Sequence, residues 1–293
     1  MKFYQLLPFT ALVVLGSILP ARAAALQPES KPRFDLVPGV VIDHSPAASG
    51  QYIGSPGLAV LPNGDFVAWG INYCAGMLSV PVDADLLSAD SWTFCEFLPS
   101  SRAWNGGDMG AWLEGNAVVT PAGDLADMLR VQTKSPDEKA AIVRISPDGK
   151  KASFDPAIGF VPFPGGGKKF AIRFDPTSKL YWSLATIVPE RHRAENPGSI
   201  RNTLALVSSP DLKQWTTRTV LLYHPDVKNH GFQYVEWLFE GDAIIAACRT
   251  AYDDGLGGAH NNHDANFLTF HRWPNFRKLT MADSTPAFTA AQP

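Results

Sequence analysis

The sequence predicts an all-β fold, a β-propeller of about five blades, from three observations. Four segments begin with a polar turn and continue into an apolar run of strand length, and they start roughly sixty residues apart. A second turn element follows each of them by roughly thirty residues. Helical periodicity is scarce along the whole chain. Such a period indicates small antiparallel sheets that stack on their neighbours, because one sheet alone cannot bury both faces.

The repeats follow one another in order along the chain. The turn-and-strand segments are "LPNGDFVAWG" at 61, "TPAGDLADMLRV" at 120, "DPTSKLYWSLA" at 175 and "FEGDAIIAACRTA" at 239. The elements that follow them are "SADSWTF", "SPDGKKASF", "SSPDLKQWTT" and "HRWPNFRK". We place the propeller at residues 43–280, after a lead-in over 24–42 and before a flexible tail over 281–293. A β-sandwich with coincidental turns is the alternative fold.

Residues 1–23 have the pattern of a secretory signal peptide. A basic start at Lys2 precedes an apolar run, and the small-x-small sequence "ARA" ends at residue 23. We therefore expect a secreted or periplasmic protein with no membrane attachment after signal removal. In such a compartment one disulfide can form among the three cysteines, and Cys74 and Cys95 are the nearer pair in sequence.

Charge and composition argue against several classes of partner. The chain has 25 Lys and Arg against 28 Asp and Glu, a net charge of −3, so no nucleic acid partner is expected. Cysteines and histidines are not closely spaced, and we expect neither a metal site nor another cofactor. The glycine-rich "FPGGGKK" at 163–169 lacks a Walker pattern and a following helix, so it is not a phosphate loop. We expect a monomer.

Two of the turns carry a known motif. "SPDLKQW", with Ser209, Asp211 and Trp215, matches the Asp-box pattern Ser-x-Asp-x-x-x-Trp, and "SPDGKKASF" is a degenerate copy. The aspartate of such a turn accepts backbone N–H bonds within its hairpin, so its role is structural. With these turns and segments such as "HGFQYVEWLFEGDAIIAACRTA" at 230–251, most of the chain resembles the sialidase-like propellers with Asp-box (BNR) repeats. It looks nearest to the propeller α-L-rhamnosidases and ulvan-type lyases that act on rhamnose–glucuronate glycans.

The chain departs from that family in two ways. Sialidases carry a Phe/Tyr-Arg-Ile-Pro motif before the first blade, and "KPRFDLVPGVVIDHSP" lacks it, which argues against sialidase activity itself. The family has six or seven blades, whereas this chain runs from "LPNGDFVAWGINY" directly into "CAGMLSVPVDADLL". Either the propeller is a reduced one or a segment near residues 70–74 has been lost.

Three residues are candidates for catalysis. His44 lies in a polar turn before the first blade, where the resemblance to the rhamnose–glucuronate enzymes places a catalytic histidine, and imidazole exchanges protons near neutral pH. Glu114 in "WLEGN" precedes a strand and is a candidate carboxylate for glycoside hydrolysis. Tyr234 precedes Glu236 by two residues, so a regular strand would place both side chains on one face, with the carboxylate activating the phenol. For each residue, a purely structural role is the alternative.

Candidate substrate-binding residues are mostly cationic or amide side chains. Guanidinium groups bind a sugar carboxylate through two parallel hydrogen bonds, and three arginines on or beside apolar strands are expected to converge. Inter-blade ion pairing is the structural alternative for any one of them. The full candidate set is Arg130, Arg201, His230, Gln233, Arg249, His263 and Asp264. His263 and Asp264 would face opposite sides of a strand, which argues against their pairing.

These residues support three hypotheses of function. The first is a glycoside hydrolase acting on an acidic or rhamnose-containing glycan, with arginines on the substrate carboxylate. The second is a polysaccharide lyase, in which a His or Tyr removes the C5 proton of a uronate. The third is a carbohydrate-binding propeller without catalysis. The partner is a glycan or oligosaccharide in all three.

Overall fold

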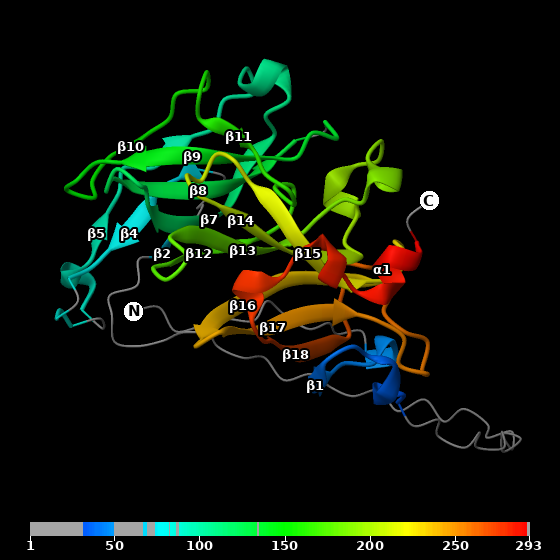
Figure 1. Ribbon diagram of the computed structural model, residues 1–293. Helices are drawn as coiled ribbons and strands as arrows, with labels where there is room; N and C mark the ends of the chain where they lie inside the picture. The colour runs from blue at the N-terminus through cyan, green and yellow to red at the C-terminus, as the bar shows by residue number, and fades with distance from the viewer. Residues whose placement is uncertain are drawn as a thin grey trace, which may run out of the picture. The chain divides into compact units, whose positions relative to one another are not determined.

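Antiparallel sheets of short strands make up most of the regular structure (Figure 1). The computed structural model describes residues 32–49, 67–68, 74–81, 83–85, 88–133 and 135–291, which belong to one compact unit. The predicted signal peptide and the first repeat turn at 61–66 lie outside these residues. No helix in the described ranges is long and apolar enough to cross a bilayer. The all-β prediction is confirmed, because the strands far outnumber the helical residues.

Three sheets share one pattern of four antiparallel strands, each paired with the next. Sheet I contains β7 (Ala111–Val119), β8 (Leu125–Gln132), β9 (Lys139–Ile145) and β10 (Ala152–Ser153), and β11 (Phe160–Pro162) also pairs with β9. Sheet II contains β12 (Ala171–Asp175), β13 (Leu180–Thr186), β14 (Thr203–Ser209) and β15 (Thr216–Tyr223). Sheet III contains β16 (Gly231–Glu240), β17 (Ala243–Ala251), β18 (Phe267–Trp273) and β1 (Val40–His44). Small meandering sheets of this kind are propeller blades.

Shorter elements complete the described chain. Two small sheets are made of β2 (Val67–Ala68), β4 (Met77–Ser79) and β5 (Thr93–Phe94), and of β3 (Cys74–Ala75) and β6 (Leu98–Pro99). The 3-10 turns are η1 (Phe34–Leu36), η2 (Ala47–Ser49), η3 (Ala89–Ser91), η4 (Asn105–Gly107), η5 (Glu190–His192), η6 (Pro197–Ser199), η7 (Phe276–Lys278) and η8 (Met281–Asp283). The α-helix is α1 (Pro286–Ala290), and it packs on β15 through Phe288 and Tyr223, whose ring centroids are 5.4 Å apart.

The repeated turns occupy equivalent places in the three sheets. Turns at 120–124, 176–179 and 241–242 each join the first strand of a sheet to its second. The two Asp-box-like turns, at 146–151 and 210–215, each join a third strand to a fourth. The sequence period therefore corresponds to one sheet per repeat.

A hydrogen bond from the backbone N–H two residues after the aspartate is common to both Asp-box-like turns. Asp211 Oδ1 accepts from the backbone N–H groups of Lys213 and Gln214, both at 2.8 Å. Asp148 Oδ1 accepts from the N–H of Lys150 at 3.1 Å. Each aspartate thus satisfies backbone donors that the tight turn leaves without a strand partner.

Sheet III takes its fourth strand from the beginning of the described chain. β1 pairs with β18, with Val40 opposite Phe270 and His44 opposite Phe267, and the two strands lie side by side in Figure 1. After β18 the chain turns into η7 instead of forming a fourth strand of its own. Because the two strands are more than two hundred residues apart, no local pattern in the sequence predicts their pairing.

The apolar faces of neighbouring sheets pack against one another. The cluster shared by sheets I and II includes Met128, Phe163, Phe170, Tyr181 and Val207. The cluster shared by sheets II and III includes Trp182, Leu206, Phe232, Trp237 and Ile244. A third cluster, containing Ala75, Met77, Trp112 and Leu129, joins sheet I to the segment before it. Trp112 and Trp237 are fully buried, so both fill the core and neither offers a face to a sugar.

A buried ion pair ties sheet II to the end of sheet III. Asp175, 2% exposed, accepts two hydrogen bonds from Arg277, at 2.7 and 2.9 Å. This guanidinium, with help from Ser178, holds the pKa of Asp175 well below its usual range. We expect Asp175→Asn to lower the free energy of unfolding by about 3 kcal/mol at pH 7. The difference should shrink as the pH falls below 4, because a lowered carboxyl pKa contributes its full stability only above the unfolded value and loses it progressively as the pH approaches the folded value.

Urea denaturation between pH 3 and 7 measures this effect. The matched control is Arg272→Gln, which removes the exposed pair with Glu240 and should cost below about 1 kcal/mol. If Asp175→Asn and Arg272→Gln lower the free energy of unfolding equally, the pair of Asp175 with Arg277 is not a strongly stabilising one.

Candidate functional site

The candidate site lies at the strand ends that face away from the Asp-box-like turns. In an antiparallel meander, the loops between sheets and the loops after second strands lie at the same end. The loop after β17 is fixed there by Asn262, whose Nδ2 donates to the carbonyl oxygens of Ser199 and Val227, both at 2.6 Å. Loops from sheets II and III are thereby held together around one group of side chains.

Two predicted catalytic residues lie in equivalent irregularities of their sheets. The pairing of β7 with β8 shifts between Trp112 and Gly115, which places Glu114 in a β-bulge. The pairing of β16 with β17 shifts between Gln233 and Glu236, which places Tyr234 in another. Bulges turn side chains out of the regular alternation and are frequent beside functional sites.

Backbone strain at Tyr234 supports its selection. Its φ of 50° lies in the left-handed region, which is unusual for a large side chain. The cost of such a conformation is about 1–3 kcal/mol, and it persists where surrounding contacts fix it. Here the surrounding contacts come from two arginines and a histidine.

Arg201 and Arg249 both lie close to the Tyr234 ring. The guanidinium carbon of Arg249 is 4.6 Å from the ring centroid and that of Arg201 is 6.0 Å from it. Arg249 Nη2 donates to the carbonyl oxygen of His263 at 2.7 Å, and Arg201 Nη1 donates to Gln233 Oε1. Both side chains are nearly buried, 6% exposed for Arg201 and 4% for Arg249.

Arg201 is a buried cation held by a neutral partner. No carboxylate in the described part of the chain forms an ion pair with it; its side-chain bond goes to the amide of Gln233. Burial is the main cause that lowers the pKa of Arg201 to about 10, and the nearby Arg130 and Arg249 lower it further. Such a cation is best stabilised by an anion that enters from outside.

The Gln233 side chain joins this cation to the loop after β17. Its Nε2 donates to the carbonyl oxygens of Asn262 and His263, at 2.8 and 2.7 Å. Gln233 is fully buried, so its amide has one fixed orientation, with the oxygen directed at Arg201. The predicted binding residues Arg201, Gln233 and Arg249 therefore belong to one network.

Tyr234, His263 and Asp264 form a chain of polar contacts. The Tyr234 hydroxyl is 3.4 Å from His263 Nε2, and His263 Nδ1 is 2.8 Å from Asp264 Oδ1. The hydrogen bond from His263 is the main cause that lowers the pKa of Asp264. With Nδ1 donating to the carboxylate, Nε2 carries the lone pair that faces the phenol. The arrangement can remove a proton from Tyr234.

The expectation that His263 and Asp264 face opposite sides is wrong. Both residues lie in the turn before β18 rather than in a strand, so the alternation of strand side chains does not apply. Asn261 Oδ1 accepts from both of their backbone N–H groups at 2.8 Å and fixes this turn.

The expectation that Tyr234 and Glu236 share a face is also wrong. Glu236 forms ion pairs with Lys169 at 3.2 Å and Arg173 at 2.7 Å, between sheets II and III. The bulge at Tyr234 breaks the two-residue period, and only a regular strand would bring the two side chains together. Glu236 therefore has a structural role.

Glu114 and Arg130 pair beside this network. Arg130 Nη1 is 3.0 and 3.3 Å from the two carboxylate oxygens of Glu114, and its Nε donates to the carbonyl oxygen of Gly167 at 3.0 Å. The Glu114 side chain is 36% exposed and can meet a ligand. Both residues lie near enough to Arg201 to affect its pKa.

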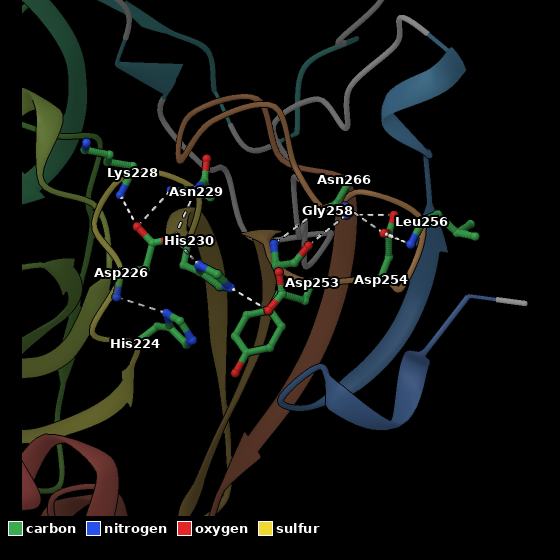
Figure 2. Close-up of polar contacts among 11 residues, drawn as sticks. His224, Asp226, Lys228, Asn229, His230, Asp253, Asp254, Leu256, Gly258 and Asn266 are labelled. Atoms are coloured by element: carbon green, nitrogen blue, oxygen red, sulfur yellow. Dashed lines mark hydrogen bonds and ion pairs between the residues drawn. The ribbon is translucent and has the colours of Figure 1, made fainter. Parts of the chain in front are cut away.

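The structure places His44 away from these arginines. It ends β1, which lies at the opposite edge of sheet III from β16. Its Nε2 bonds to buried Asp254 at 2.9 Å, and its ring stacks on Phe267 with centroids 4.7 Å apart. Figure 2 shows Asp254 also accepting from Leu256, Gly258 and Asn266.

His230 belongs to a separate group of polar side chains, shown in Figure 2. Its ring stacks on His224 with centroids 3.5 Å apart, and its two nitrogens lie 3.2 Å from Asp226 and 3.4 Å from Asp253. Burial is the main cause that lowers the pKa of His224, and the adjacent His230 adds to it. His224 is a member of this group that the sequence analysis did not select.

Lys168 and Glu138, which lie next to the Arg130 contact at Gly167, were not predicted from the sequence. Lys168 is fully buried and binds Glu138, with Nζ 2.6 Å from Oε1. The glycine-rich stretch at 163–169 was the signal that could have identified Lys168, because three successive glycines followed by a lysine are unusual beside a strand. No comparable signal marks Glu138. No group of three or more potential metal ligands occurs among the residues that the structure describes.

Comparison with known proteins gives no family. No protein-family model matches the sequence, and no curated protein matches it. Similar solved structures include an exo-1,5-α-L-arabinanase from a bovine ruminal metagenomic library, with 13% identity over 68% of this chain and a TM-score of 0.42. An intramolecular trans-sialidase from Ruminococcus gnavus has 16% identity over 70% and a TM-score of 0.39. A Bombyx mori GH32 β-fructofuranosidase has 15% identity over 78% and a TM-score of 0.38.

The chain spans only part of those three proteins, 64%, 39% and 52% of their respective lengths. Because the identities and TM-scores are low, these similarities assign neither a family nor an activity to this chain. The function has to be argued from the site.

Proposed function

We propose that this protein is a glycoside hydrolase that acts on a glycan carrying a carboxylated sugar, such as a uronic or sialic acid. The observation that carries the proposal is Arg201, a buried guanidinium whose partner is the neutral amide of Gln233. A sugar carboxylate would supply the missing negative charge through two parallel hydrogen bonds. Arg249 also lies over the Tyr234 ring and is near enough to Arg201 to affect its pKa, so both can approach the same anion.

Tyr234 is the proposed nucleophile. His263, oriented by Asp264, takes the phenolic proton while the phenol oxygen attacks the anomeric carbon. Glu114, which pairs with Arg130 in the free protein, must be protonated in the reacting complex and gives that proton to the departing sugar oxygen. Water then attacks the anomeric carbon and loses a proton to Glu114, while the Tyr234 oxygen leaves the sugar and regains its proton from His263. We leave His44 out of the reaction because it lies at the opposite edge of sheet III.

The tyrosine–histidine contact also supports a second candidate, a polysaccharide lyase. In that reaction the arginines neutralise the uronate carboxylate, and Tyr234 or His263 removes the C5 proton. The leaving oxygen departs with formation of a C4–C5 double bond, and no water is consumed. A new absorbance near the ultraviolet edge in the product would establish the lyase and exclude the hydrolase.

The assignments to the Asp-box family and to an extracytoplasmic compartment remain part of this proposal. The hydrogen bonds of the turns at Asp148 and Asp211 support the first. The signal-peptide pattern over residues 1–23 supports the second.

The first experiment tests recognition of the carboxylate. Titration calorimetry with glucuronic acid, N-acetylneuraminic acid and their methyl esters should show binding of at least one free acid and loss of that binding on esterification. Arg201→Met should raise the Kd for that acid roughly 30-fold or more, because the variant lacks a buried charge that faces the ligand. Hydrolysis of the matching 4-methylumbelliferyl glycoside then tests turnover.

The control variant is Arg272→Met, which changes an exposed arginine paired with Glu240. It should bind the free acid with unchanged affinity. Equal affinity for the acid and its ester in the wild-type protein would exclude the carboxylate-binding role of Arg201.

A further inference from the structure

The glycine-rich segment 163–169, "FPGGGKK", joins sheets I and II and accepts a hydrogen bond from Arg130. Its turns are closed by backbone bonds from Gly166 N to Phe163 O at 2.9 Å and from Lys168 N to Gly165 O at 3.0 Å. A side chain at Gly166 would place its Cβ 2.3 Å from the carbonyl oxygen of Lys139. The segment therefore needs glycine there to lie close against the start of β9.

Lys168 holds this segment from within. Its side chain is 0% exposed, and its Nζ donates to Glu138 Oε1 at 2.6 Å and to the carbonyl oxygen of Pro197 at 2.9 Å. The other oxygen of Glu138 accepts from the backbone N–H of Gly165 at 2.9 Å. One ion pair thus connects the β8–β9 loop, the glycine-rich segment and the start of η6.

Gly167, the last of the three glycines, contacts the candidate site. The carbonyl oxygen of Gly167 accepts from Arg130 Nε at 3.0 Å, while Glu114 binds Nη1 of the same guanidinium. These two contacts fix the plane of the Arg130 guanidinium. Moving Gly167 would break its hydrogen bond with Arg130 Nε and let the Arg130 guanidinium rotate.

We infer that Lys168 is a positioning residue, whose buried pair with Glu138 holds the Gly167 carbonyl on Arg130 and so orients Arg130 toward an anionic sugar. The inference rests on the proposed function for its ligand, but the geometry of Lys168, Glu138 and Gly167 is independent of that ligand. Lys168 does not touch the substrate. Its effect passes through the backbone to Arg130.

The first test follows Arg130 without any ligand. In NMR spectra, the Nε–H of Arg130, assigned by its loss in Arg130→Lys, should exchange slowly with water, because it is bonded to Gly167. Lys168→Met should speed this exchange about tenfold or more, since even small displacements weaken a directed bond. Glu138→Gln, which keeps the shape of the side chain, should also speed the exchange of the Arg130 Nε–H. This variant replaces Lys168→Met in the experiment if Lys168→Met does not fold.

The matched control is Lys169→Met, the neighbouring lysine. Lys169 pairs with Glu236 on β16 and has no bond to Glu138 or Gly167 in the described structure. Its replacement should leave the exchange of Arg130 Nε–H unchanged. Unchanged exchange in folded Lys168→Met or Glu138→Gln protein would overturn the inference.

The second test measures the consequence for binding. With the carboxylated sugar that the wild-type protein binds, Lys168→Met should raise KM and Kd about tenfold and leave kcat within about threefold. The double variant Lys168→Met/Glu138→Gln restores charge balance but not the position of Gly167, so its affinity should stay low. Full recovery in the double variant would overturn the positioning role in favour of a charge effect.

Failure of the two proposals can be told apart. If the wild-type protein binds no carboxylated sugar and Lys168→Met still releases Arg130 Nε–H, the proposed function fails and the positioning of Arg130 stands. If the sugar binds and Lys168→Met changes neither exchange nor affinity, the positioning inference fails and the proposed function stands.

Discussion

Replacing Tyr234 by Phe should lower kcat on the order of 10³-fold while leaving the protein folded. The variant loses only the phenol oxygen, which is the proposed nucleophile, and its loss should cost at least as much as the roughly 10²–10⁴-fold that a positioned proton-transfer group contributes. Phe keeps the ring that both Arg201 and Arg249 contact, so Kd for the carboxylated sugar should change less than about threefold. Steady-state kinetics and calorimetry on the same preparation separate these two effects.

Two comparisons make the Tyr234 result specific. His263→Gln removes the proton acceptor and should also lower kcat, with little added loss in the double variant, because the two residues act as a unit. Tyr252→Phe is the matched control, since Tyr252 contacts His224 and His230 rather than the arginines. A Tyr234→Phe protein with full kcat would remove Tyr234 from the chemistry.

Replacing Asp127 by Asn should remove a large pH dependence from the stability of the folded protein. Asp127 lies on β8, is 0% exposed, and has no hydrogen-bond partner for its carboxylate oxygens among the described residues. Burial raises the pKa of Asp127 from 3.8 to about 7, and the nearby Asn116 backbone amide offsets this only in part. The folded protein therefore keeps this proton at pH values where the unfolded chain has released it.

The sign of the effect follows from proton binding. Between pH 3.8 and about 7 the folded state holds more protons at Asp127 than the unfolded state, so the free energy of unfolding falls as the pH rises. The total loss above pH 7 is on the order of 4 kcal/mol. Asp127→Asn has no carboxyl group to ionise at this position, so its free energy of unfolding does not fall in this way. Its stability relative to wild type should rise steadily from pH 4 to pH 7 and then level off.

Urea denaturation at pH 4, 5, 6, 7 and 8 measures this difference. Asp124→Asn, in the exposed turn between β7 and β8, is the matched control and should show no such slope. Other titrating groups, such as His271, whose pKa burial lowers to about 4, affect both proteins equally and cancel in the difference. A pH-independent difference between Asp127→Asn and wild type would show that the folded and unfolded proteins bind this proton equally, which would contradict a raised pKa of Asp127.

Local patterns in the sequence predicted the scaffold well. Turn residues and apolar runs at 120, 175 and 239 specify hairpins through short-range hydrogen bonds, and those hairpins are found at equivalent places in sheets I, II and III. The sequence also predicted the arginines, Glu114 and Tyr234 as site residues, because charged or polar side chains on or beside apolar strands often bind a ligand or a partner. The pairing of β1 with β18 was not predictable in this way, since it joins the two ends of the described chain.

The sequence by itself determined the all-β class, the repeat of one sheet per period and the residue types available for binding an anion. Only the tertiary structure decided which of them meet. Bulges turned Tyr234 away from Glu236, a turn brought His263 to Asp264, and the fold buried Lys168 behind Arg130. The physical reason is the separation along the chain between the residues that interact. Hairpins form through neighbouring residues, whereas the charge partners of a buried group come from whichever strands and loops pack around it.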